Sequence, residues 1–138
     1  MGTIGHLHPL IVHFPIALVV IAAAAESAVA ATGDQRWRAA ALVNIRAGAA
    51  FAVPAAVAGW WLVPALGLGP TPTVAYHRWL GTAAACATVA AALATWRADR
   101  WSRRDVWTFR LAVTVACACV VVTGHLGALL VWGSDFLP

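Results

Sequence analysis

The sequence predicts an all-α fold, an integral membrane four-helix bundle, from its composition and from four long apolar segments. Of its 138 residues, 62% are hydrophobic and only 10% are charged. A soluble domain is nearer half apolar, with about a quarter of its residues charged. Each apolar segment reaches the roughly 20 residues that a helix needs to cross a bilayer. The length suits a single transmembrane domain over residues 1–138.

Proline, glycine and charge place the ends of the spans. We expect them at about residues 9–31, 39–66, 74–96 and 107–133. Pro9 suits the first turn of a helix, where a missing N–H group costs nothing. Pro54 predicts a kink in the second span. Prolines and glycines over residues 64–72 mark the connection between the second and third spans.

The arginines predict the orientation of the bundle. Eight of the nine flank the first and third connections, and only Arg78 lies on the opposite side. Basic residues are retained on the cytoplasmic side of a membrane. Both termini should therefore be extracytoplasmic. Because the basic residues lie in loops between spans, they report topology, and no nucleic-acid partner is expected.

Three histidines lie in or at the end of apolar spans, namely His13, His77 and His125. At about 1.5 Å per residue they lie roughly 6, 5 and 12 Å below the outer ends of their spans, respectively. All three thus fall in the outer half of the membrane, where a buried imidazole usually marks a functional site. Antiparallel helices would bring their ring nitrogens into one bundle core, a common place for a cofactor.

The surrounding residues favour haem over other metal centres. Glu26 lies near the cytoplasmic end and Asp135 at the outer surface, so this half offers no carboxylate for a di-iron centre or a hard cation. Neutral imidazoles suit haem iron, copper or zinc. Gly124 and Gly127 flank His125 and would leave space for a macrocycle, although small residues also serve close helix packing.

Further polar residues complete the predicted site. Arg78 directly follows His77 and would bind a haem propionate in a bidentate manner, or else extend to lipid headgroups. His8 precedes Pro9 at the surface and is a fourth ligand or a donor to one. At the other side of the membrane, Glu26 and Arg46 lie at comparable depth and are expected to pair structurally, the alternative for Glu26 being a proton path or a quinone site.

The segment His8–Leu18, with the sequence HPLIVHFPIAL, resembles the opening helix of a family of predicted bacterial membrane proteins, "domain of unknown function 2231". That family also carries a histidine at the start of its third span and a Gly-His-Leu-Gly segment in its fourth. The histidines that match these positions are His8, His13, His77 and His125. Where members often carry an aspartate late in the second span, this chain has Gly59-Trp60-Trp61, so no carboxylate role is expected there.

The resemblance spans essentially the whole chain. It implies a multi-pass protein of the bacterial cytoplasmic (inner) membrane, in contact with the lipid bilayer. Members of this kind are sometimes joined to cytochrome-type modules, which implies redox work.

The leading hypothesis is a membrane-anchored b-type cytochrome, a non-catalytic electron-transfer subunit of a larger oxidoreductase or respiratory complex. One bis-histidine haem b in the outer leaflet would take two ligands from His13, His77 and His125. The deepest pair is His13 with His125, whereas matching depth favours His13 with His77. The remaining histidine, or His8, would hold a propionate or orient a ligand. Electrons would pass between a periplasmic cytochrome and quinone or another subunit.

Two alternatives belong to other functional classes. The same three imidazoles could hold a copper or zinc ion for transport or delivery. The chain could also be a structural membrane anchor subunit, whose histidines only form hydrogen bonds between helices.

Overall fold

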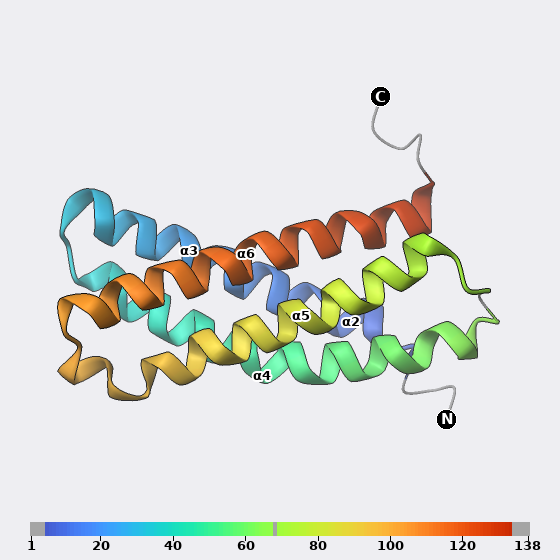
Figure 1. The fold of residues 1–138 in the computed structure, drawn as a ribbon, viewed down its shortest axis with the longest axis horizontal. Helices are drawn as coiled ribbons and strands as arrows, with labels where there is room; N and C mark the ends of the chain where they lie inside the picture. The colour runs from blue at the N-terminus through green and yellow to red at the C-terminus, as the bar shows by residue number, and fades with distance from the viewer. Residues whose placement is uncertain (1–4, 68, 134–138) are drawn as a thin grey trace.

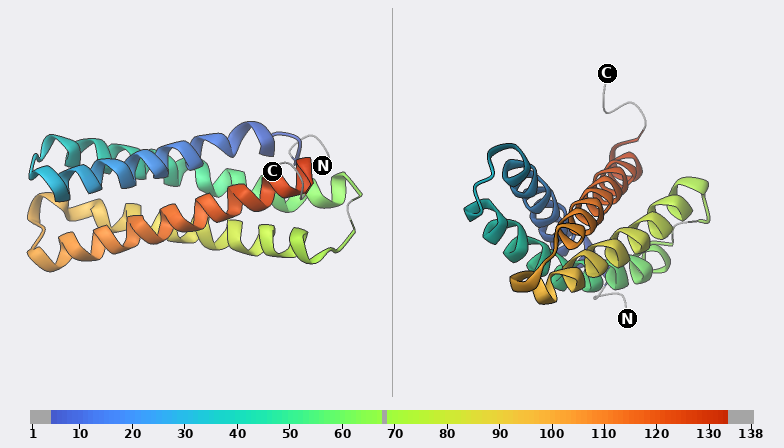
Figure 2. Two further views of the ribbon diagram at one scale, coloured as in Figure 1. Left: turned by 90° about the horizontal axis from the view of Figure 1, so that it is seen from above. Right: turned by 60° about the vertical axis from the view of Figure 1, so that its left-hand side comes forward.

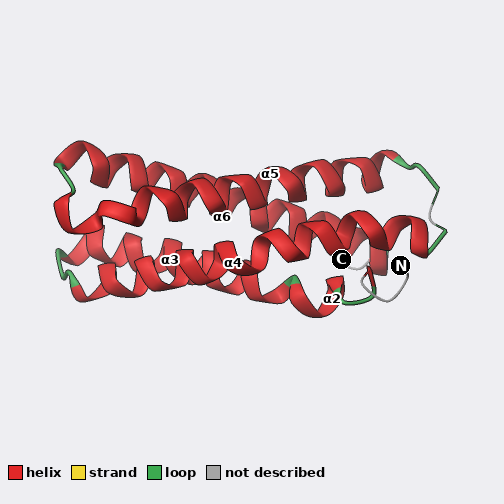
Figure 3. Cartoon of the chain, turned by 90° about the horizontal axis from the view of Figure 1, so that it is seen from below, coloured by secondary structure: helices red, strands yellow, loops and turns green. Residues whose placement is uncertain are grey.

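The computed structural model describes residues 5–67 and 69–133, and these residues form helices joined by short connections (Figures 1 and 3). Four helical segments are long and apolar enough to cross a membrane. They run over His8–Thr32, Arg36–Ala65, Pro72–Arg100 and Arg103–Trp132. The predicted all-α fold and its four spans are therefore confirmed, with bounds that differ by a few residues.

The first span is interrupted near its beginning. It consists of α2 (His8–Ile11) followed by α3 (His13–Thr32). Pro15 accounts for the break at Val12, because it has no N–H to donate to the carbonyl of Ile11 and its ring crowds that carbonyl. The helix α3 ends at Gly33, whose φ of 74° is left-handed and carries no Cβ penalty in glycine.

Four further helical segments follow, and two of them begin at a residue whose side chain caps the first turn. They are α4 (Arg36–Ala65), α5 (Pro72–Ala94), the 3₁₀ helix η1 (Thr95–Arg100) and α6 (Arg103–Trp132). The hydroxyl of Thr71 accepts the N–H of Val74 at the start of α5. A reciprocal capping box between Ser102 and Asp105 begins α6. The helix α4 continues through Pro54.

The bundle consists of two helical hairpins, α3–α4 and α5–α6, that lie alongside each other (Figure 2). Their shared core is thin and consists mainly of alanine and valine, with Ile45 and Phe109 as its largest fully buried side chains. Small residues let helix backbones approach closely. In the most apolar stretch of each span, only 22–33% of the residues are buried inside the bundle. The rest of this apolar surface faces the lipid bilayer.

The two ends of the bundle differ in their polar residues (Figure 1). One end carries the α3–α4 connection and η1, and we call it the basic end. Its arginines are Arg36, Arg38, Arg46, Arg97, Arg100, Arg103, Arg104 and Arg110. The other end carries α2, the start of α5 and the end of α6, and we call it the histidine end. Its span histidines are His8, His13, His77 and His125. That the histidine end is extracytoplasmic stays a prediction.

Candidate functional site

Two histidines from different parts of the chain meet at the histidine end. The ring centroids of His8 on α2 and His77 on α5 lie 6.2 Å apart, and the ring planes are almost perpendicular, at 86°. Both side chains are half-buried. Because α2 belongs to the first span and α5 to the third, this contact connects the two halves of the bundle.

Each of the two rings is held by a backbone carbonyl of a neighbouring helix. Nδ1 of His8 lies 2.8 Å from the carbonyl oxygen of Ala55 on α4. Nδ1 of His77 lies 3.1 Å from the carbonyl oxygen of Thr123 on α6. A carbonyl oxygen only accepts hydrogen bonds, so each Nδ1 carries the proton and donates it. In the neutral rings, Nε2 then has a lone pair available, which is the arrangement found in most metal-bound histidines.

Two glycines make room for these rings. A Cβ atom at Gly59 would lie 2.9 Å from Cε1 and 3.0 Å from Nδ1 of His8. A Cβ atom at Gly127 would lie 3.0 Å from Cε1 of His77. Gly124, also expected to make room for a macrocycle, faces the side chain of Ile16 instead. The space beside Gly59 and Gly127 is therefore filled by the two imidazole rings and not left open for a macrocycle.

The other two span histidines point elsewhere. His13, at the start of α3, is exposed on the surface of the bundle. His125 is exposed on α6, two residues from both Thr123 and Gly127. Residues two apart on a helix do not face the same way, so the His125 side chain leaves α6 on a different side from the one that contacts His77. The ligand pairs expected from depth, His13 with His125 or with His77, stay predictions.

The donor set around the pair is small. Among residues 5–67 and 69–133, no three histidine, cysteine, aspartate or glutamate side chains are arranged to hold a metal ion. His8 and His77 together supply two imidazole nitrogens. Any metal between them would need to accept two protein ligands, or to take further ligands from a macrocycle or from water.

Arg78, the predicted propionate ligand, stacks on a tryptophan. Its Cζ atom lies 3.7 Å from the ring centroid of Trp60, a cation–π contact that the sequence reasoning did not anticipate. The indole N–H of Trp60 donates to the hydroxyl of Thr82 at 2.9 Å. That hydroxyl in turn donates to the carbonyl of Arg78, also at 2.9 Å. This network holds the guanidinium of Arg78 over the ring of Trp60.

Two buried polar atoms in this region have no hydrogen-bond partner. They are Nε of Arg78 and Oγ1 of Thr123, the residue whose carbonyl holds His77. A buried donor or acceptor without a partner costs free energy, and native structures rarely leave one unexplained. These two atoms therefore indicate where a bound group or an ordered water can form hydrogen bonds.

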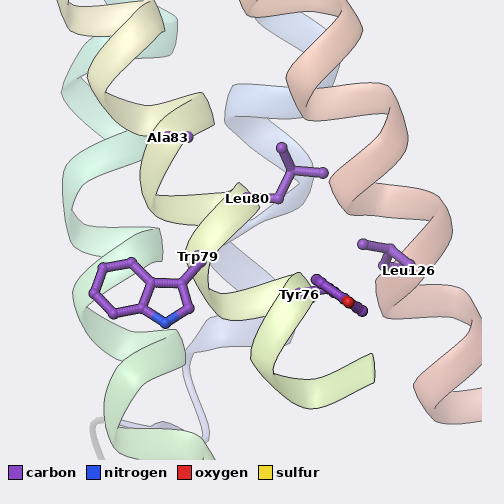
Figure 4. Close-up of a pocket in the computed structure, with 5 residues that line it drawn as sticks. All are labelled: Tyr76, Trp79, Leu80, Ala83 and Leu126. Atoms are coloured by element: carbon purple, nitrogen blue, oxygen red, sulfur yellow. The ribbon is translucent and has the colours of Figure 1, made fainter. Parts of the chain in front are cut away.

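An apolar groove lies on the outside of the bundle between α5 and α6 (Figure 4). It has a volume of about 470 Å³ and is lined by Tyr76, Trp79, Leu80, Ala83 and Leu126. Neither His8 nor His77 belongs to this lining, so the groove does not provide a slot between the two imidazoles. In a bilayer its apolar walls suit lipid chains.

Buried charge at the basic end is paired differently from the prediction. Glu26 contacts Arg38 and Arg110, not Arg46: Nε of Arg110 donates to its Oε1 at 2.8 Å, and Nη2 of Arg38 donates to the same oxygen at 2.9 Å. Nε of Arg38 also lies 2.7 Å from Oε2, but is not aligned as a hydrogen bond.

The expected Glu26–Arg46 pair is therefore wrong, and the end of α5 explains why. Arg46 donates to the hydroxyl of Thr95 at 2.8 Å and to its carbonyl at 2.7 Å. Carbonyls at the end of a helix lack intrahelical partners, and a cation nearby satisfies them. Arg46 thus stabilises the end of α5, and Glu26 is left to the two arginines that approach it from α4 and α6.

Comparison with known proteins adds one finding. Residues 5–136 match the family described as "Predicted membrane protein (DUF2231)", and this range includes both histidines of the pair. No curated protein and no solved structure matches the chain.

Proposed function

Because the chain belongs to this family of predicted membrane proteins, whose description states no activity, we propose a function from its histidine pair. The chain is a membrane-embedded electron-transfer subunit in which His8 and His77 would hold one haem b. It exchanges electrons at the histidine end, between an extracytoplasmic redox partner and quinone or another subunit of a larger oxidoreductase.

The spacing of the two rings carries this proposal. An imidazole nitrogen lies about 2.0–2.1 Å from a bound metal, and the ring centre lies roughly 1 Å further away, so opposed imidazoles on one metal have centroids roughly 6 Å apart. The centroids of His8 and His77 are 6.2 Å apart. Their Nδ1–carbonyl hydrogen bonds leave Nε2 for the metal and increase its basicity.

The polar atoms beside the pair also suit haem b. A propionate would supply the acceptor that Nε of Arg78 lacks, and arginine is the natural partner of a carboxylate. Bound haem supplies a one-electron iron centre. Gly59 and Gly127 bring α4 and α6 directly against the rings, so haem binding requires these two helices to move back from them.

A copper ion is a second candidate, and the close packing at Gly59 and Gly127 favours it. A single ion between two imidazoles needs no slot for a macrocycle, and imidazole is a suitable ligand for copper. Zinc fits less well, since its structural sites take four protein ligands and its catalytic sites three. The two described imidazoles fall short of both.

The test is spectroscopy and metal analysis of the full-length chain purified in detergent. We expect a Soret band, and a dithionite-reduced spectrum of a bis-histidine b-type haem, in the wild type. His8→Ala and His77→Ala should each lose the haem, whereas the control variants His13→Ala and His125→Ala should keep it.

Other results would change or reject the assignment. Loss of haem in His13→Ala and His125→Ala, with retention in His8→Ala and His77→Ala, would move the site to the pair expected from depth. One copper per chain without a Soret band would select the second candidate. Absence of both haem and copper, after reconstitution with each, would reject the function.

A further inference from the structure

The net positive charge of this protein lies entirely at its basic end. Eight arginines there face the four carboxylates Glu26, Asp34, Asp99 and Asp105, which leaves a formal charge of +4, the value for the whole chain. Every basic residue is an arginine, and the chain contains no lysine. Arginine binds phosphate through two parallel hydrogen bonds, whereas lysine acts as a point charge.

Half of these arginines are paired with other groups of the same chain. Arg38 and Arg110 neutralise Glu26, and Arg46 binds the end of α5 at Thr95. Nη2 of Arg36 lies 2.8 Å from Oδ2 of Asp34. Its guanidinium lowers the pKa of that carboxyl, so this pair stays charged and mutually neutralised.

The other four arginines form an exposed group that we call the arginine cluster, Arg97, Arg100, Arg103 and Arg104, on η1 and the first turn of α6. The two nearby carboxylates neutralise it only in part. Asp99 contacts Arg100 at 3.5 Å, with both side chains largely exposed. The carboxylate of Asp105 accepts from the backbone N–H and the hydroxyl of Ser102, at 2.8 and 2.7 Å.

The position of the cluster on α6 is electrostatically unfavourable without an anion. Arg103 and Arg104 are the first two residues of α6, and the N-terminus of a helix carries a partial positive charge that disfavours cations. In the preceding η1, the non-helical backbone at Arg97 (φ −118°, ψ 36°) turns the chain between α5 and α6. Four guanidinium groups and a helix N-terminus therefore gather within one short connection.

Two exposed tryptophans set the depth of the cluster in the membrane. Trp96 is 83% exposed and Trp107 is 59% exposed, and they flank the four arginines in sequence. Tryptophan collects at the level of lipid headgroups. The arginines between these two rings therefore lie at the depth of the lipid phosphates.

We propose that the arginine cluster binds the phosphate of anionic phospholipids. Clusters of four to eight basic residues beside a membrane span favour such lipids. The histidine end has no equivalent surface in its described part, since its arginine, Arg78, is stacked on Trp60. This inference is independent of the proposed electron transfer and of the identity of any metal.

The test is native mass spectrometry of the full chain in detergent with added phosphatidylglycerol or phosphatidylcholine. The wild type should retain phosphatidylglycerol in preference to phosphatidylcholine. Neutralising one arginine should lower the affinity for phosphatidylglycerol roughly fivefold, as expected for one cation at an anionic surface. The double variant Arg103→Gln/Arg104→Gln should show a loss of roughly 25-fold on the same basis.

The control is Arg36→Gln, which removes an arginine of the basic end that is already neutralised by Asp34. Its affinity for phosphatidylglycerol should match that of the wild type. Should the double variant fail to fold, the wild type in high salt replaces it, because salt screens exposed charges and should abolish the preference.

Three results would overturn the proposal. The first is equal retention of the two lipids by the wild type. The second is a loss in Arg36→Gln as large as that in the double variant, which would assign the effect to the charge of the whole end. The third is complete displacement of phosphatidylglycerol by millimolar inorganic phosphate, which would identify a site for free anions.

Discussion

The basic end and the histidine end are built from the same slender helices, yet they satisfy their polar groups in different ways. At the basic end, the buried carboxylate of Glu26 contacts two arginines, and Arg46 binds the free end of α5. At the histidine end, the imidazoles of His8 and His77 donate to backbone carbonyls, and Oγ1 of Thr123 and Nε of Arg78 stay without hydrogen-bond partners. At the first end, Oε2 of Glu26 and Nε of Arg38 also lack a hydrogen bond but face each other as an ion pair at 2.7 Å, whereas the second end has capacity for a further group.

The cost of burying charge explains this difference. An uncompensated buried charge destabilises a protein by several kcal/mol, so Glu26 requires partners within the chain. A buried neutral hydroxyl without a partner, such as that of Thr123, costs about 1–3 kcal/mol, which a stable bundle tolerates. The buried charge of the basic end must therefore be paired within the chain, whereas neutral polar atoms of a binding site can be left without partners inside the protein.

The largest expected effect concerns the basic end. Glu26→Gln leaves Arg38 and Arg110 without their counter-ion in a buried position, and should lower the free energy of unfolding by about 3–5 kcal/mol. The measurement is unfolding of the purified protein in mixed micelles. Asp34→Asn, which removes an exposed pair, is the control and should have no measurable effect. Similar stabilities of the two variants would show that the Glu26 contacts do not hold this end together.

A smaller loss of stability is expected at the contact between the His8 ring and Gly59. Gly59→Ala places a Cβ 2.9 Å from Cε1 of His8, so the ring must move and lose its bond to Ala55. We expect a destabilisation of about 1–3 kcal/mol, typical of overpacking. Gly124→Ala is the matched control, because its Cβ would meet Ile16 at an ordinary 3.6 Å. Unfolding of both variants measures the difference. Equal stability of the two would show that Gly59 is not needed to accommodate the His8 ring.

The smallest expected change in the free energy of unfolding comes from removing a buried hydroxyl, and it depends on whether that hydroxyl has a hydrogen-bond partner. Thr88→Val removes a buried hydroxyl that donates to the carbonyl of Ala84, and should cost about 0.5–1.5 kcal/mol. Thr123→Val removes a hydroxyl without a partner, so the ligand-free protein should unfold with the same free energy as the wild type. Thermal unfolding of both variants compares them. A larger loss in Thr123→Val would mean that this hydroxyl is already bonded in solution.

The spans were predictable because each depends on local sequence. Apolar length places α3, α4, α5 and α6 within a few residues, and Pro9 and Gly33 lie where a helix begins and ends. The position of His8 was not predictable in the same way. Counting depth along the first span puts His8 at the surface, whereas in the structure α2 packs against α4 and the His8 ring reaches the carbonyl of Ala55.

The charged pairs show the same limit. Depth alone matches Glu26 to Arg46, because both lie near the cytoplasmic ends predicted for their spans. The structure separates them, since helix rotation turns Arg46 toward Thr95 at the end of α5 and leaves Glu26 to Arg38 and Arg110. Depth is readable from a count of residues, but the face that a side chain presents depends on how the helices rotate against one another.

The sequence by itself determined that this chain crosses a membrane four times, that its charge gathers at one end, and that its histidines within the spans gather at the other. These properties follow from transfer free energies and charges that are summed residue by residue along the chain. Only the tertiary structure decided that His8 meets His77, that Gly59 and Gly127 seat their rings, and that Glu26 takes two arginines. Each of these contacts joins residues from different helices, and depends on how the helices rotate and how closely they approach, which no single segment contains.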